Sequence, residues 1–223
     1  MSKQLLVQAL AKVTAGILCM VLVLFVPAGT LHWWNAWLLM GILFLPMVCA
    51  GFVLFAKAPD LLRKRLNMKE EQREQKQVIL YSMLMFVGGF AAAGLGWRFQ
   101  VGLLPAWGSW AAAAVFLASY GLYAEVLREN AYLSRTVEIQ EGQKVISTGL
   151  YGIVRHPMYS VTLFLFLSMP LVLGSAVSLL FFLPYPLLIA KRIRNEEQVL
   201  EQGLAGYREY KQKVRYRLVP FVW

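Results

Sequence analysis

The sequence predicts an all-α integral membrane protein. Of its 223 residues, 59% are hydrophobic and only 15% are charged, which is far from the composition of a soluble domain. Apolar runs of about 20 residues, the length that a helix needs to cross a bilayer, recur along the chain. Basic residues gather between these runs. Together the three observations predict four transmembrane helices and a C-terminal helical hairpin, and a local pattern described below adds a short cytoplasmic β-hairpin.

The four predicted transmembrane helices correspond to the apolar runs 13–30, 34–56, 78–97 and 107–124. Small residues are concentrated in the third run, between Gly88 and Gly96, and in the fourth, between Ala111 and Ala114. Because small residues let transmembrane backbones approach closely, these two helices should pack against each other or against the C-terminal hairpin. The loop 57–77 mixes basic and acidic residues, and we assign it no chemistry.

Positive charge orients the predicted helices in the membrane. Of the 22 basic residues only Arg98 falls in a segment that would face outward, so the positive-inside rule predicts cytoplasmic N- and C-termini. We expect a multi-pass protein of a bacterial inner membrane. The net charge of +10 follows from this topology and from attraction to anionic headgroups, so it predicts membrane lipids and not nucleic acid as partners.

The pattern changes between residues 134 and 148. Two short segments of alternating apolar and polar residues flank Glu141 and Gly142, which predicts the cytoplasmic β-hairpin. We therefore divide the chain into N-terminal transmembrane helices, residues 1–133 with the cytoplasmic loop 57–77, and a functional core, residues 134–223. The core contains the helical hairpin and a C-terminal amphipathic segment.

The stretch 148–159 carries charge at an unusual place. Arg155 and His156, one of two histidines, stand beside Pro157 and directly before a long apolar run. An arginine that enters the hydrocarbon costs on the order of a few kcal/mol, so it normally pairs, reaches the interface or binds something. Pro157 pre-sets the first turn of the next helix. We expect the backbone amides at this helix start to be free to face a ligand.

The C-terminal hairpin should consist of an apolar run 158–173, a break at Gly174 and Ser175, and a return that ends near Ala190. Both limbs are short against a hydrocarbon core of about 30 Å. The hairpin therefore brings polar groups from its two ends to the same cytoplasmic level. These groups are Arg155, His156 and Tyr159 at its start and Arg192, Glu196 and Glu197 at its end.

Several separated blocks of this core resemble one known family. They are Arg155-His-Pro-Met-Tyr159, Arg192-Ile-Arg-Asn-Glu-Glu-Gln-Val-Leu200, Tyr207-Arg-Glu-Tyr210 and the segment from Val214 to Pro220. In this order they look like the C-terminal core of the isoprenylcysteine carboxyl methyltransferase family and its phospholipid N-methyltransferase relatives, over about residues 148–220. One departure is Val161, where relatives often carry glycine.

The resemblance implies an S-adenosylmethionine-dependent methyltransferase whose lipophilic acceptor arrives from the bilayer. By family analogy Arg192 holds an acceptor carboxylate, most simply that of a prenylcysteine, and Glu197 orients the site. The residues implied for the donor pocket are Tyr151, Arg155, His156, Pro157, Tyr159 and Glu196. No metal is implied, and Cys19 and Cys49 lie in apolar runs where buried small side chains are expected.

Other interpretations stay open at this point. Taken singly, each arginine could be a positive-inside anchor and each glutamate its surface partner. A phospholipid amine is a second possible acceptor. Membrane sterol reductases, which use NADPH, also resemble the Arg-His-Pro-x-Tyr block, but they tend to carry Asn and Gly-Glu where this chain has Met158 and Ser160-Val161. A channel or scaffold is disfavoured because no predicted span has charge at its middle.

Overall fold

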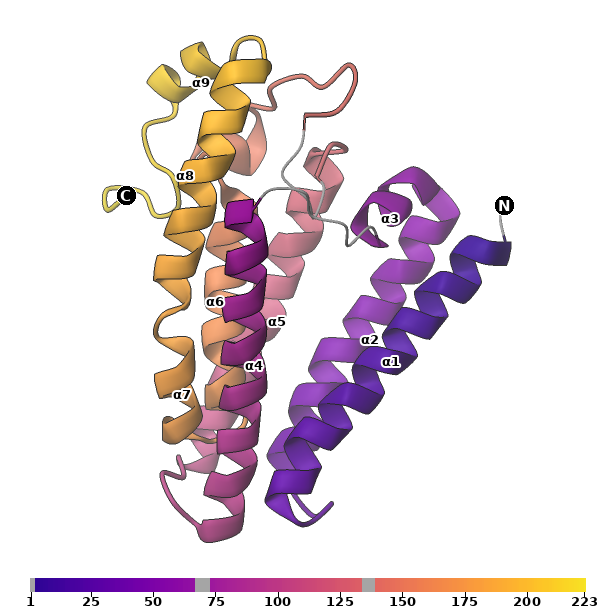
Figure 1. Ribbon diagram of the computed structural model, residues 1–223, viewed down its shortest axis with the longest axis vertical. Coiled ribbons are helices and arrows are strands. Elements are labelled where there is room, and N and C mark those ends of the chain that lie inside the picture. The colour runs from indigo at the N-terminus through magenta and orange to yellow at the C-terminus, as the bar shows by residue number, and fades with distance from the viewer. Residues whose placement is uncertain (1–2, 67–72, 134–138) are drawn as a thin grey trace.

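The computed structural model describes residues 3–66, 73–133 and 139–223, and within these ranges the chain is helical and forms no strand (Figure 1). The helices are α1 (Lys3–Ala28), α2 (Trp34–Lys57), α3 (Pro59–Leu66), α4 (Arg73–Phe99), α5 (Ala106–Glu129), α6 (Pro157–Val172), α7 (Ala176–Phe182), α8 (Tyr185–Gly203) and α9 (Tyr207–Lys213), with a 3-10 turn at Gly149–Gly152. The predicted all-α membrane class is confirmed.

Five stretches of the described chain are long and apolar enough to cross a membrane: Lys3–Ala28, Trp34–Lys57, Lys76–Phe99, Ala106–Glu129 and Ala176–Gly203. The sixth apolar helix, α6, has 16 residues. The return limb of the C-terminal hairpin is longer than expected. It is interrupted at Leu183 and Pro184, then runs on as α8 through the polar block to Gly203, because neither Pro nor Gly occurs between Pro186 and that residue.

Glycines of α4 allow two close helix contacts. A Cβ atom at Gly89 would lie 2.5 Å from the Phe182 ring of α7, and one at Gly94 would lie 2.6 Å from the main-chain oxygen of Leu24 in α1. The predicted packing of this helix against the C-terminal hairpin is therefore confirmed, and packing against α1 comes in addition. In Figure 1 the α1–α2 hairpin meets the other helices at one end and diverges from them toward the other.

Polar residues hold the helices together at the end where the α1–α2 hairpin meets the bundle. Asn35 Nδ2 donates to Ser109 Oγ at 2.9 Å and to the main-chain oxygen of Val172 at 3.0 Å, so α2, α5 and α6 share one buried amide. Trp33 stacks on Trp97 with ring centroids 5.8 Å apart. These contacts fix the position of α6, whose first turn lies at the opposite end.

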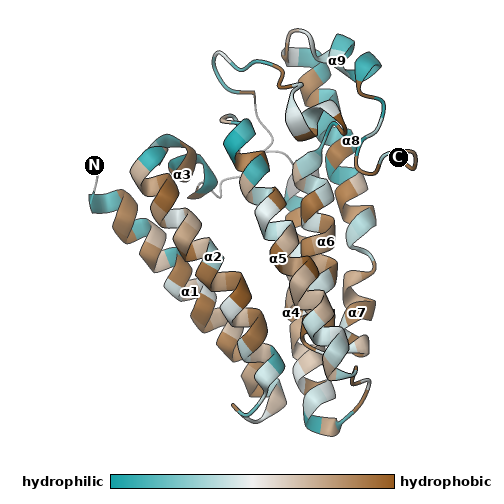
Figure 2. Cartoon of the chain, turned by 180° about the vertical axis from the view of Figure 1, so that it is seen from behind, coloured by the Kyte–Doolittle hydropathy of each residue, from teal (hydrophilic) through white to brown (hydrophobic). Residues whose placement is uncertain are grey.

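That opposite end carries the polar elements of the fold. Figure 2 shows hydrophobic residues along the lengths of the helices and hydrophilic residues around α3, α9 and the loops beside them. The predicted β-hairpin is not confirmed there. Residues 134–138 lie outside the described ranges, and residues 139–147 form a turn followed by a segment without regular secondary structure.

The alternation of apolar and polar residues that predicted a strand instead reflects packing on two sides of this segment. Val145 packs with Tyr207 and Tyr210 of α9, whereas Ile146 packs with Val126 and Tyr151. Successive side chains therefore enter two different hydrophobic clusters.

A second expectation is also wrong: Cys19 and Cys49 are exposed, on the outer faces of α1 and α2.

Candidate active site

The C-terminal segment runs across the start of α6. The main-chain nitrogen of Arg155 donates to the oxygen of Tyr216 at 2.9 Å, and that of His156 donates to the oxygen of Arg217 at 3.0 Å. The nitrogen of Tyr159 donates to the oxygen of His156 at 3.0 Å. The expectation that the amides at this helix start face a ligand is therefore not met at Arg155, His156 and Tyr159, because bonds within the protein occupy these three amides.

Glu197 binds two arginines at this end. Arg155 Nε donates to Glu197 Oε1 at 2.7 Å, and Arg217 Nε donates to Oε2 at 2.9 Å. Arg155 Nη1 also donates to the main-chain oxygens of Val214 and Arg215, at 2.7 and 2.8 Å. The side chains of Arg155 and Glu197 are only 5% and 4% exposed. We call Arg155, Glu197 and Arg217 the clamp, because together they tie the start of α6, α8 and the C-terminal segment to one another.

His156 stands between the clamp and an adjacent cavity. Its Nε2 lies 3.3 Å from Glu197 Oε1, and its Nδ1 lies 3.9 Å from Glu196 Oε1. The ring also stacks on that of Tyr159, with centroids 5.8 Å apart. The orientation of the imidazole is therefore set from both of its nitrogens and from one face.

Tyr159 links the two polar residues that α8 presents to the cavity. Its hydroxyl donates to Glu196 Oε2 at 2.5 Å and accepts from Arg192 Nε at 2.8 Å. The Arg192 guanidinium also lies over the Tyr159 ring, 5.8 Å from its centroid. Arg192 and Glu196 are four residues apart, so they share one face of α8.

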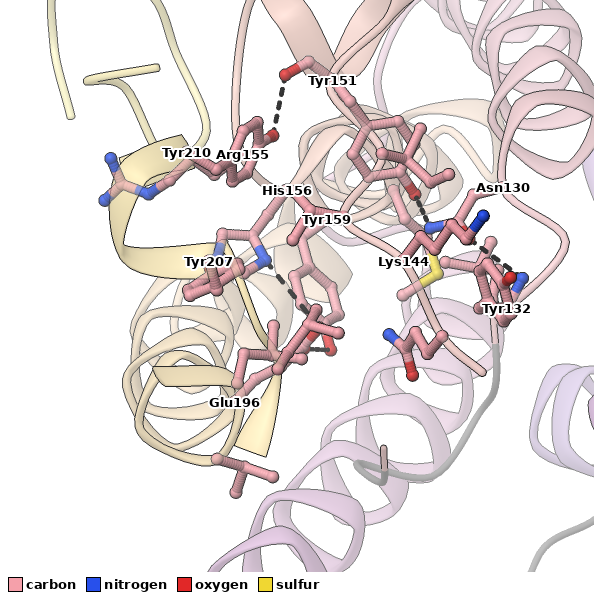
Figure 3. A pocket seen from close by; sticks show the side chains of 18 of the residues that line it. Asn130, Tyr132, Lys144, Tyr151, Arg155, His156, Tyr159, Glu196, Tyr207 and Tyr210 are labelled. Atoms are coloured by element: carbon pink, nitrogen blue, oxygen red, sulfur yellow. Dashed lines mark hydrogen bonds and ion pairs between the residues drawn. The ribbon is translucent and has the colours of Figure 1, made fainter. Parts of the chain in front are cut away.

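The opposite side of the cavity comes from the end of α5 and the loop that follows it. In Figure 3 Asn130, Tyr132 and Lys144 lie across from His156 and Glu196. One side of the cavity thus carries a carboxylate and aromatic rings, and the other carries an amide, a phenol and an ammonium group.

Three tyrosines complete the lining. Tyr151 accepts a hydrogen bond from Asn130 Nδ2 at 2.9 Å through its hydroxyl, and its main-chain oxygen accepts one from Tyr210 at 2.7 Å. Burial raises the pKa of Tyr151 to about 12 and also raises the pKa values of Tyr207 and Tyr210, so all three phenols stay neutral at physiological pH. The buried hydroxyl of Tyr207 has no hydrogen-bond partner among the described residues.

Six of the eight site residues predicted from the sequence line this one cavity. They are Tyr151, Arg155, His156, Tyr159, Arg192 and Glu196. The other two lie beside it: Pro157 is buried in the first turn of α6, and Glu197 belongs to the clamp. The polar groups of the two hairpin ends thus meet as expected, although the two glutamates point to different environments.

Sequence reasoning missed the residues of the opposite side. Asn130, Tyr132 and Lys144 belong to none of the blocks that carry the resemblance, and no local pattern marks them. Tyr207 and Tyr210 lie within those blocks but received no role in the donor pocket. Their spacing of three residues, which places both on one face of α9, was the available signal.

A known protein family matches the segment that supplies most of the residues lining this cavity. The sequence model of the isoprenylcysteine carboxyl methyltransferase (ICMT) family matches residues 110–202, from α5 to the end of α8. The match therefore begins before the segment 148–220 that carried the resemblance and ends before α9.

Two known proteins are similar to the chain. A Delta(14)-sterol reductase of Mus musculus is 32% identical over 91 residues, which are 40% of this chain and 22% of the reductase. The chain thus spans about a fifth of the length of that relative. A solved structure of the eukaryotic intramembrane Ras methyltransferase ICMT, determined without a monobody, has a TM-score of 0.58 at 18% identity. That match covers 96% of this chain and 77% of the solved one, and it shows a common fold.

The family match spans both polar blocks of the cavity, from Arg155 to Tyr159 and from Arg192 to Glu197, and the shared fold extends over nearly the whole chain. The predicted resemblance is confirmed over residues 110–202, where the chain matches the sequence model of the isoprenylcysteine carboxyl methyltransferase family.

Proposed function

We propose that the protein transfers a methyl group from S-adenosylmethionine to a lipophilic acceptor that carries a carboxylate, of which a prenylcysteine is the model. The observation that carries this proposal is the family match over residues 110–202, because the cavity draws its two polar blocks from that segment. The membrane-spanning helices below the cavity suit an acceptor that reaches it from the bilayer.

The residues of the cavity fit this donor. A sulfonium cation is complemented by the carboxylate of Glu196 and by the faces of aromatic rings such as Tyr159. The unpartnered hydroxyl of Tyr207 offers a further polar contact, since a buried hydroxyl without a partner is costly in the free protein. When bound, S-adenosylmethionine supplies the electrophilic methyl group.

Arg192 is the residue we assign to the acceptor. Its side chain lines the cavity, and its Nε is fixed by the hydroxyl of Tyr159. A guanidinium is suited to a carboxylate because its planar fork matches the two oxygens. An ionised carboxylate is already a nucleophile, so its methylation requires alignment of the acceptor and no proton transfer.

Glu197 and Arg155 act through their neighbours in this proposal. The carboxylate of Glu197 lies 3.3 Å from His156 Nε2 and accepts from Arg217 in the clamp. Glu197 therefore positions the imidazole and keeps the C-terminal segment over the site. This is the orienting role that the resemblance implies for Glu197. Arg155 serves the same purpose, because its side chain binds Glu197 and two main-chain oxygens.

The proposal is tested by methyl transfer from tritiated donor. Purified protein would be incubated with a prenylcysteine analogue, with phosphatidylethanolamine or with a total lipid extract, and labelled products would be identified. Base-labile label in the prenylcysteine ester is the expected result. Label in the phospholipid amine alone would assign phospholipid N-methylation to the protein. Absence of transfer to every acceptor would overturn the proposal.

The similarity to a Delta(14)-sterol reductase supports a second candidate, an NADPH-dependent membrane reductase. The two functions differ in the cofactor that the cavity should bind. Calorimetry with S-adenosylhomocysteine and with NADPH separates them. We expect binding of S-adenosylhomocysteine and none of NADPH, and the reverse result would assign the protein to the reductases.

A further inference from the structure

We propose that Lys144 holds the α-carboxylate of the donor's amino-acid head. This inference rests on the proposed function and assigns a residue that no block of the resemblance contains. It follows from the basic groups of the cavity, from the way the protein holds residue 144, and from the distribution of charge across the cavity.

Three basic side chains line the cavity in the described part of the chain: Arg155, Arg192 and Lys144. Arg155 is buried, and its Nε and Nη1 bind Glu197 and two main-chain oxygens. Arg192 binds the hydroxyl of Tyr159. Lys144 is exposed and makes no hydrogen bond or ion pair with any residue that the structure describes. It is therefore the cation that can turn to a ligand without breaking a bond within the protein.

The turn before Lys144 is fixed by hydrogen bonds. Gly142 adopts a φ of +67°, which glycine tolerates, and its main-chain oxygen accepts from the Tyr132 hydroxyl at 3.1 Å. The main-chain nitrogen of Gln143 donates to the oxygen of Gln140 at 3.1 Å, and the Gln143 side chain accepts from the Gln140 nitrogen at 2.9 Å. The turn thus leaves residue 144 at the rim of the cavity.

The residues after Lys144 are fixed by packing. Val145 packs with Tyr207 and Tyr210, and Ile146 packs with Val126 and Tyr151. The backbone at residue 144 is therefore held on both sides, and only the flexible side chain has freedom to move. An ammonium group on such a stem is suited to reach a carboxylate within the cavity.

The charges across the cavity match the amino-acid head of the donor. That head carries cationic groups and one carboxylate, and a carboxylate removed from bulk water needs a partner. Glu196 stands on one side of the cavity, and Lys144 on the other beside Asn130 (Figure 3). The unpartnered, 4% exposed Tyr207 independently points to a polar ligand in the same space.

The test compares two ligands that differ in the amino-acid head. S-adenosylhomocysteine has this head, and 5′-methylthioadenosine lacks it but keeps the adenosine and the thioether. Dissociation constants of both would be measured by calorimetry on the full-length protein and on Lys144→Ala. Lys213→Ala is the matched control, because Lys213 is exposed in α9, carries the same charge and does not line the cavity.

We expect Lys144→Ala to weaken S-adenosylhomocysteine roughly tenfold and to leave methylthioadenosine unchanged, as an exposed charge-assisted hydrogen bond predicts. Lys144→Arg should keep most of the affinity, and Lys213→Ala should change neither ligand. Equal weakening of both ligands, or no change in either, would overturn the assignment while the proposed function stands. A wild-type protein that binds neither ligand would overturn both.

Discussion

Replacement of Glu197 should destabilise the protein strongly, whereas replacement of its neighbour Glu196 should do so only slightly. Glu197 accepts from Arg155 and Arg217 at 2.7 and 2.9 Å, and its side chain is 4% exposed. Glu197→Ala leaves the buried guanidinium of Arg155 without its counter-charge. Breaking a buried pair in this way costs about 3–5 kcal/mol. We expect the lower half of that range, because Arg155 keeps its bonds to two main-chain oxygens.

Glu196 has a much smaller structural role. Its side chain is 25% exposed, and it accepts one hydrogen bond, from the Tyr159 hydroxyl at 2.5 Å. Loss of such a bond costs about 1 kcal/mol when water can replace the lost partner. The two alanine variants should therefore differ by roughly 2 kcal/mol in unfolding free energy, which corresponds to about 4–8 °C in melting temperature for a chain of this size.

The measurement is thermal unfolding of each purified variant, followed by tryptophan fluorescence and paired with S-adenosylhomocysteine affinity. Glu196→Ala should melt close to the wild type and bind the ligand more weakly. Glu197→Ala should melt earlier and release the segment after Val214 to limited proteolysis. If the two variants melt within 1 °C of each other, the clamp does not carry the stability that its geometry implies.

The other predictions concern the donor, the acceptor and the topology. His156→Ala should weaken donor binding, whereas Arg192→Ala should lower turnover of a carboxylate acceptor roughly ten- to a hundredfold, and Arg192→Lys should restore little of it. Calorimetry measures the first effect and initial rates measure the second. Equal loss of donor affinity in His156→Ala and Arg192→Ala would place Arg192 in the donor pocket. Tyr207→Phe should leave the free protein as stable or slightly more stable, because it removes a hydroxyl without a partner, yet weaken S-adenosylhomocysteine several-fold in calorimetry. Single cysteines at Gly142 and Ala106 should react with an impermeant reagent from opposite sides of the membrane, and labelling from one side would reject the proposed topology.

The helices could be predicted from the sequence because the bilayer imposes one length on them. Apolar runs predicted the four spans α1, α2, α4 and α5 and the two limbs of the C-terminal hairpin, α6 and α7–α8, in the right order. The extent of α8 could not be read in the same way. The polar block from Lys191 to Glu197 marks the edge of the apolar run, but a helix ends where its backbone is interrupted and not where its hydropathy falls.

The side of the cavity that holds Asn130 and Lys144 could not be predicted from local patterns. Lys144 reaches the cavity because Val145 and Ile146 pack into clusters built by α9, α5 and the turn that contains Tyr151. Asn130 reaches it as the residue that ends α5, with its side chain bonded to the Tyr151 hydroxyl. Alternation of apolar and polar residues is compatible both with strand pairing and with this division between two clusters. Only tertiary contacts distinguish these two arrangements, so the local pattern could not exclude the predicted β-hairpin.

Helical geometry predicts different environments for the paired glutamates, beyond what the motif resemblance implies. Consecutive residues of an α-helix point about 100° apart, so Glu196 and Glu197 cannot both face one cavity squarely. Arg192 lies four residues before Glu196 and shares its face, which assigns Glu196 to the cavity and leaves Glu197 to face another part of the protein. A glutamate directed away from solvent at a membrane surface needs a cation, and Arg155 was the nearest candidate in the motif. The pair could thus have been predicted from helical geometry, whereas Arg217 could not, because it reaches Glu197 only after the C-terminal segment has folded back across α6.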